Sequence, residues 1–118
     1  MRGSDEFREA VRRGVRTGRP TLVVHATTTD GDPEVRIGFV VSKAVGNAVT
    51  RNRVKRRLRH LSLAALSATP PGTRVVVRAL PRAAERPHEV EGDLDRAWEK
   101  AISRLKERER HVSRRVKP

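Results

Sequence analysis

The residues best suited to chemistry in this sequence form a basic cluster near the middle of the chain. Six of the nine residues at positions 51–59 are Arg or Lys, and Asn52 lies among them. A guanidinium is a planar fork of donors that can hold one phosphate through two hydrogen bonds. On a helix, several of these cations lie one turn apart, where like charges repel by about 0.2–0.5 kcal/mol per pair. Bound phosphates remove that repulsion, so the cluster predicts binding of a polyanion.

The distribution of charge along the chain supports this prediction. The formal net charge is +13, from 27 basic and 14 acidic residues. Residues 35–84 contain eleven Arg or Lys and no Asp or Glu, whereas eight of the acids lie at 85–109. A surface built only for solubility mixes the two signs. An Arg-rich composition bias without a partner is the alternative, but it does not explain the missing acids, so we favour a polyanionic partner.

The basic cluster is expected to lie on a helix over residues 50–67, with Thr50 as its N-cap. Apolar residues recur along it at helical spacing, at Val54, Leu58, Leu61 and Ala65. A solvated surface helix with an apolar underside is the alternative interpretation. It explains the apolar stripe, but it explains neither the absence of Glu nor the choice of Asn52, because Asn is a middling helix former.

The residue types on this helix, and the few aromatic residues in the chain, indicate which type of nucleic acid is bound. Almost all of its exposed positions are Arg or Lys, which suits contacts to phosphates more than the reading of base edges. Aromatic residues make up only 3% of the chain, which argues against a platform that stacks bases. We therefore expect a structured RNA that is held by its backbone.

The sequence offers little that could catalyse a reaction. The four His residues are isolated from one another, at positions 25, 60, 88 and 111, and there is no Cys. The acids Glu91, Asp93 and Asp95 could bind a metal, but they lie at the expected start of a helix, where the helix dipole favours acids for structural reasons. The segment VGNAV lacks the spacing of a glycine-rich phosphate loop. We expect no catalytic residue and no metal site in the protein.

The elements that position the basic helix predict an α+β fold. We expect helices over residues 5–13, 50–67 and from Pro87 onward, and strands over 21–27, 35–42 and 73–79, with room for a short extra strand at 43–49. The resulting order, α-β-β-(β)-α-β-α, predicts a small mixed sheet covered by helices. We expect one domain over residues 1–118, in which a basic tail from about residue 108 is flexible.

The location of the protein is predicted from the segments that the sequence lacks. No apolar run approaches the length of a membrane span, and no signal peptide is visible. The absence of Cys excludes disulfides. We expect a soluble cytoplasmic protein without a membrane partner.

Residues 36–59 form a long ordered motif, RIGFVVSKAVGNAVTRNRVKRRLR. This motif resembles the signature of the bacterial ribonuclease P protein component. In that family a strand ends in Ser-Lys, Gly-Asn-Ala-Val follows, and Arg-Asn-Arg opens a basic helix. Weaker likeness at residues 4–14 and 75–83 extends the resemblance over about two thirds of the chain. The resemblance implies the fold of ribosomal protein S5 domain 2, with a left-handed βαβ crossover.

The resemblance also implies a function. The family's holoenzyme is an endoribonuclease that removes the 5′ leader of precursor tRNA, and its catalytic subunit is an RNA whose Mg²⁺ ions activate the water. The protein is the accessory subunit, expected to be monomeric in a 1:1 complex, that binds the catalytic RNA and the leader. A general structured-RNA-binding protein of the ribosomal or chaperone type is the alternative. The dependence of substrate affinity on leader length separates the two.

Residues that match the family's motif are expected to carry its roles. The RNA-contacting positions are Lys43, Arg51, Asn52, Arg53, Lys55, Arg56 and Arg59. The leader-binding cleft lies between the first helix and the sheet, and the residues assigned to it are Phe7, Val11, Leu22 and Val24. The family often has aromatics at the last three places, so we expect the leader to be held by van der Waals contact and backbone charge. The alternative for Phe7 is that it is a core residue that only packs the first helix.

Overall fold

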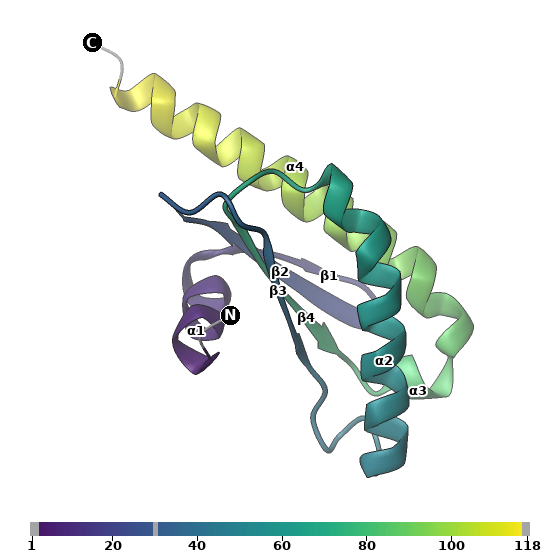
Figure 1. The fold of residues 1–118 in the computed structure, drawn as a ribbon. Helices are drawn as coiled ribbons and strands as arrows, with labels where there is room; N and C mark the ends of the chain where they lie inside the picture. The colour runs from purple at the N-terminus through teal and green to yellow at the C-terminus, as the bar shows by residue number, and fades with distance from the viewer. Residues whose placement is uncertain (1–2, 30, 117–118) are drawn as a thin grey trace.

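A four-stranded sheet supports the basic helix. The computed structural model describes the backbone of residues 3–29 and 31–116 and the side chains of residues 8–29 and 31–109. The helices are α1 (Gly3–Arg13), α2 (Ala48–Ala65), α3 (Arg82–Glu85) and α4 (Val90–Val116), with 3₁₀ helices η1 (Leu66–Ala68) and η2 (Pro87–Glu89). The strands are β1 (Val15–Gly18), β2 (Leu22–Thr28), β3 (Arg36–Val40) and β4 (Thr73–Ala79). Figure 1 shows α1 on one side of the sheet and α2 and α4 on the other.

The sheet is mixed, and its strand order is β1-β2-β4-β3. The β1–β2 and β2–β4 pairs are antiparallel, whereas β3 and β4 are parallel neighbours. A parallel pair needs a crossover connection, and here α2 lies within it. The predicted α+β class with a small mixed sheet is confirmed, and the left-handed sense of the crossover stays a prediction.

Strand β1 is the element that the sequence did not predict. The extra strand expected at 43–49 is not formed, because residues 43–45 make a turn there. The fourth strand instead follows α1 directly and pairs with β2. Because Gly14 has no side chain, the backbone can pass directly from α1 into β1. A Cβ at Gly14 would lie 2.3 Å from the carbonyl oxygens of Ala10 and Ala26. The sequence does not predict β1, because its four residues are too few to show an alternating pattern.

The main core lies between the sheet and the helices α2 and α4. Side chains alternate along a strand, so Leu22 and Val24 of β2 share one face with Val75 and Val77 of β4. All four are at most 1% exposed. The helices contribute Val54, Leu58, Val90, Leu94, Ala97, Trp98, Ala101, Ile102 and Leu105 to this core. The helix expected from Pro87 onward thus packs one face against the sheet.

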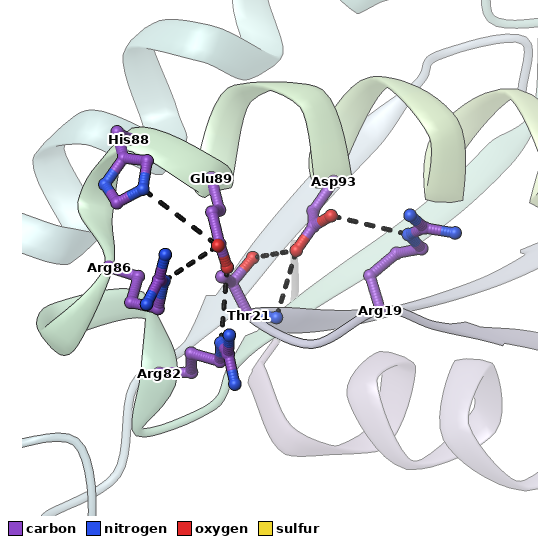
Figure 2. Close-up of polar contacts among 7 residues, drawn as sticks. All are labelled: Arg19, Thr21, Arg82, Arg86, His88, Glu89 and Asp93. Atoms are coloured by element: carbon purple, nitrogen blue, oxygen red, sulfur yellow. Dashed lines mark hydrogen bonds and ion pairs between the residues drawn. The ribbon is translucent and has the colours of Figure 1, made fainter.

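Asp93 anchors α4 to the turn between β1 and β2 (Figure 2). Its Oδ2 accepts hydrogen bonds from the Thr21 backbone N–H at 3.1 Å and from the Thr21 hydroxyl at 2.7 Å, and its Oδ1 lies 3.4 Å from the Arg19 Nε. Burial raises the pKa of Asp93, but the bonds from Thr21 and Arg19 outweigh burial and hold the pKa below its usual value. Asp93 is thus a structural acid. The described residues hold no group of three or more His, Cys, Asp or Glu placed to bind a metal.

Helix α4 is the longest element and is fastened along its first half. The Trp98 Nε1 donates to the Thr69 hydroxyl at 2.9 Å, and the Thr17 hydroxyl donates to the Ala97 carbonyl at 2.7 Å. The helix continues to Val116, so residues 108–116 of the predicted tail are helical. Across the described part of the chain, no helix combines the length and the apolar character that crossing a bilayer requires.

Candidate nucleic-acid interface

The start of α2 is set by Gly46 and Asn47. The Asn47 side chain caps the helix, because its Oδ1 accepts a hydrogen bond from the Thr50 N–H at 2.9 Å. Gly46 lets the preceding turn close against the helix, since a Cβ there would lie 2.8 Å from the Thr50 Cγ2. The prediction of Thr50 as the N-cap is therefore wrong: the helix begins at Ala48, and Thr50 lies in its first turn. The missed signal was Asn47 itself, since Asn is among the strongest N-caps.

Helix α2 has an apolar side and a cationic side. Val54 and Leu58 are buried, and Leu61 and Ala65 pack partly buried against the same core, so the predicted stripe is confirmed. The exposed polar side chains are Asn52, Arg53, Lys55, Arg56, Arg57, Arg59 and His60. Arg51 is half-buried, and its Nε is buried without a hydrogen-bond partner among the described residues.

The cations of α2 are not neutralised by any carboxylate of the described residues. The helix contains no acidic residue, and within the part of the chain that is described none of its Arg or Lys side chains makes an ion pair. The neighbouring α3 is different, because Arg82 and Arg86 both bind Glu89, at 3.2 and 2.8 Å (Figure 2). Exposed charges of one sign attract a polyanion, which binds by releasing its counterions. The geometry of α2 is therefore that of an anion-binding face.

A second candidate surface is the sheet face beneath α1. Val23 and His25 of β2 alternate with the core residues of that strand, so they point to the side on which Figure 1 shows α1. In the sheet, His25 lies opposite Val76 of β4 and Arg16 of β1. This face thus places an imidazole and an arginine next to apolar strand residues.

His25 is unusual among the side chains of this face. It is 4% exposed, and neither ring nitrogen has a hydrogen-bond partner among the described residues. Burial, followed by the positive charges of Arg16 and Arg78, holds its pKa below the usual value. His25 is therefore neutral at pH 7, with one donor and one acceptor unused. A buried polar group in this state costs stability unless a ligand satisfies it.

Comparison with known proteins decides the family. The family model described as Ribonuclease P matches residues 1–102. The ribonuclease P protein component of Streptomyces bikiniensis is 52% identical over 111 residues, which cover 86% of this chain and 90% of the relative. The chain belongs to the ribonuclease P protein family. The ribonuclease P protein component of Beutenbergia cavernae is also similar, with 57% identity over 96 residues that cover 80% of this chain and 81% of the relative.

Solved ribonuclease P proteins share the fold. The protein from Staphylococcus aureus has a TM-score of 0.77 at 23% identity, over 86% of this chain and 95% of that chain. The protein from Thermotoga maritima has a TM-score of 0.70 at 23% identity, over 81% of this chain and 91% of that chain. The family resemblance inferred from the sequence motif is confirmed, and these structures agree with the predicted α+β fold class.

The predicted RNA-contacting residues of this ribonuclease P protein lie on one helix and the turn before it. Asn52, Arg53, Lys55, Arg56 and Arg59 are exposed on α2, and Arg51 is half-buried there. Lys43 is exposed in the turn that leads into the helix, where its carbonyl accepts from the Gly46 N–H at 3.2 Å. Their contacts with RNA stay a prediction, and the structure adds Arg57 to the same exposed group.

The residues predicted for the leader-binding cleft are not brought together. Val11 is 47% exposed on α1, whereas Leu22 and Val24 are 0% and 1% exposed in the core against α2 and α4. The assignment of Leu22 and Val24 to a cleft between α1 and the sheet is wrong, because their side chains lie on the face of β2 that packs against α2 and α4. The side chain of Phe7 lies outside the described residues. Sequence reasoning missed His25, and the alternation of β2 could have found it only if the side occupied by α1 had been known.

Replacing Asn47 with Ala is expected to lower the free energy of unfolding by about 1 kcal/mol, the usual value of a side-chain cap. The variant loses the acceptor that lies 2.9 Å from the Thr50 N–H. Asn52→Ala is the matched control, since the Asn52 side chain is exposed and makes no hydrogen bond within the described residues. Urea denaturation compares the two variants. Equal loss of stability in both would refute Asn47 as the cap.

Proposed function

We propose that this chain is the protein subunit of ribonuclease P, which binds the catalytic RNA and the 5′ leader of precursor tRNA and assists removal of the leader. The single observation that carries the proposal is the exposed, acid-free face of α2, whose cations make no ion pair within the described residues. That face coincides with the Arg-Asn-Arg motif at residues 51–53. The RNA lies along α2, with Lys43, Arg51, Asn52, Arg53, Lys55, Arg56 and Arg59 as its contacts.

The leader is placed on the sheet face beneath α1. Val11 and the face that carries Val23 and His25 form its path, and Phe7 belongs to the same helix as Val11. An imidazole with an unused donor and acceptor can hydrogen-bond a base edge, and Arg16 supplies charge for a phosphate. The leader is thus held by van der Waals contact, one polar group and backbone charge.

The reaction and its setting belong to the whole ribonucleoprotein. Catalysis is by the RNA subunit, which binds the Mg²⁺ ions that activate the water, and this chain contributes binding and orientation. Two of its bonded carboxylates serve the fold, because Asp93 binds Thr21 and Arg19, and Glu89 binds Arg82 and Arg86. We place the protein in the cytoplasm, as a monomer in a 1:1 complex with the RNA.

Reconstitution tests the proposed function. The chain is mixed with a bacterial ribonuclease P RNA at low Mg²⁺, and cleavage of precursor tRNA is measured with and without protein. Cleavage is expected to be faster with the protein, and the protein without RNA is expected to cut nothing. The proposal fails if the protein does not improve cleavage by the RNA.

A general structured-RNA-binding protein is the second candidate. It is favoured by one observation: every exposed charged side chain of α2 is an Arg or a Lys, which suit phosphates of any RNA. The two candidates differ in the substrate, because only a ribonuclease P subunit makes affinity depend on leader length. Holoenzyme affinity is compared for precursor tRNAs with leaders of increasing length and for tRNA without a leader.

Replacing His25 with Ala is expected to weaken holoenzyme affinity for leader-bearing precursor tRNA roughly tenfold, the loss of about one base contact. Affinity for tRNA without a leader is expected to stay unchanged. Thr28→Ala is the control, because Thr28 is exposed and lies on the other face of the same strand. Fluorescence titration with both substrates measures the effect. Equal weakening on the two substrates would instead make His25 a purely structural residue.

A further inference from the structure

A small cavity lies beside the anion-binding face, between α2 and the α3–η2 segment. Its volume is about 90 Å³, and its apolar wall is formed by Val54 of α2 together with Ala83, Ala84, Pro87 and Val90. Figure 1 shows α3 next to α2. Helix α3 is the element that follows β4 in the chain. Pockets that enclose drug-sized ligands measure roughly 300–1,000 Å³. This cavity can therefore take one flat ring, but not a whole nucleotide.

The rim of the cavity is cationic. Arg53 and Arg57, one helical turn apart on α2, line it together with Thr50. Both Arg side chains are exposed, and neither makes an ion pair within the described residues. The lining contains no carboxylate. A small apolar cavity with two guanidinium groups on one rim, neither of them paired within the described residues, matches a ligand that has an apolar ring flanked by anionic groups.

The far wall of the cavity is braced by ion pairs. Glu89 binds Arg82 at 3.2 Å and Arg86 at 2.8 Å, which ties α3 to η2 across the break between them (Figure 2). The same bonds neutralise Glu89, whose pKa is held below its usual value by these donors despite the opposing effect of burial. The Glu89 ion pairs thus hold the wall opposite Arg53 and Arg57 in place.

We propose that this cavity receives one unstacked nucleobase of the RNA that binds α2, while Arg53 and Arg57 hold the phosphates on either side of that nucleotide. The inference rests on the proposed function for the identity of the RNA. Recognition of single bases in RNA uses nucleotides that are splayed out of a helix and inserted between apolar side chains. The site adds a base contact to a helix that otherwise grips phosphates, and it fixes the register of the RNA along α2.

Mononucleotides test the pocket without any assumption about ribonuclease P. The full chain is titrated with adenosine 5′-monophosphate, ribose 5-phosphate and adenosine, and the methyl signals of Ala83 and Ala84 are followed by NMR. The monophosphate is expected to shift both methyls and to bind at least tenfold more tightly than ribose 5-phosphate. Equal affinity for these two ligands, or shifts that leave both alanine methyls unchanged, overturns the base site. Adenosine binding more tightly than the monophosphate overturns the role of the Arg pair.

A cavity-filling variant connects the pocket to RNA binding. Ala84 is half-buried at the cavity, and Ala84→Leu is expected to abolish the monophosphate-induced shifts and to weaken binding of a bacterial ribonuclease P RNA about tenfold. Ala64→Leu is the control, because Ala64 is exposed on α2 outside the cavity lining. Unchanged RNA affinity in folded Ala84→Leu overturns the inference. Such a result, together with successful reconstitution by the unmodified chain, leaves the proposed function standing.

Discussion

Replacing Asp93 with Ala is expected to lower the free energy of unfolding by about 3 kcal/mol at pH 7, because the Thr21 hydroxyl, its N–H and the Arg19 guanidinium lose a buried charged acceptor. Asp93 is 5% exposed, and its closest contact with Thr21 measures 2.7 Å. For a chain of this size the change corresponds to a fall in Tm of roughly 10–15 °C. Thermal and urea unfolding measure it.

The same carboxylate makes a directed prediction about pH. The pKa of Asp93 is lower in the folded protein than its usual value of 3.8. Its stabilisation is therefore full above the unfolded pKa and is lost as the pH falls through the lower folded pKa. The stability difference between the parent chain and Asp93→Ala should be constant from pH 5 upward and shrink below about pH 4.

Asp95→Ala is the matched control for this carboxylate, since Asp95 is exposed on the same helix two residues away. It should change stability by less than about 0.5 kcal/mol. A loss at Asp95 as large as at Asp93 would contradict the anchoring role.

Reversing two charges on α2, with Arg53→Glu and Arg56→Glu together, is expected to weaken binding of a bacterial ribonuclease P RNA by roughly 100- to 1,000-fold. Both side chains are exposed and have no ion-pair partner among the described residues, so their whole charge acts on the RNA. Arg53→Ala alone should reduce the slope of log K against log salt by about one unit if Arg53 contacts one phosphate. Filter binding over a range of salt concentrations measures both effects.

The control for this experiment carries the same change in charge on another helix. Arg96→Glu with Lys100→Glu changes the net charge equally, and both residues are exposed one turn apart on α4. If attraction were set by net charge alone, the two double variants would bind RNA equally weakly. We expect the α4 variant to lose much less affinity, and an equal loss would show that α2 is not the specific contact.

The parts of the fold that the sequence predicted well are those with a strong repeating pattern. The stripe of Val54, Leu58 and Leu61 has the period of a helix, and β2 and β4 are rich in β-branched residues. Strand β1 is too short for such a pattern, because four residues cannot show a period, and its formation depends on the close approach of Gly14 to Ala26. That contact is tertiary and leaves only a glycine in the sequence.

Some parts of the candidate site could likewise be predicted from the sequence, and others could not. The exposed cations of α2 could be predicted because they are the residues of a helix that remain when the apolar stripe is removed. The face of β2 beneath α1 could not, since both faces of that strand are buried and Val23 is as apolar as Val24. Alternation then assigns residues to two faces without saying which face meets α1. The cavity beside α2 could not be predicted from the sequence either. Ala83 and Ala84 lie beside Val54 only because of the direction that the chain takes after β4.

In the chain, α2 comes between β3 and β4, and this order affects how the protein folds during translation. The partner of β3 in the sheet is β4, which is separated from it in the chain by the whole of α2. During translation α2 therefore leaves the ribosome before the strand that completes the sheet beneath it, when Val54 and Leu58 still lack β4 and α4 as partners. The basic segment is then positively charged and without its packing partners while it lies beside a large ribosomal RNA. The sheet can close only after β4, which ends at Ala79, has also left the ribosome.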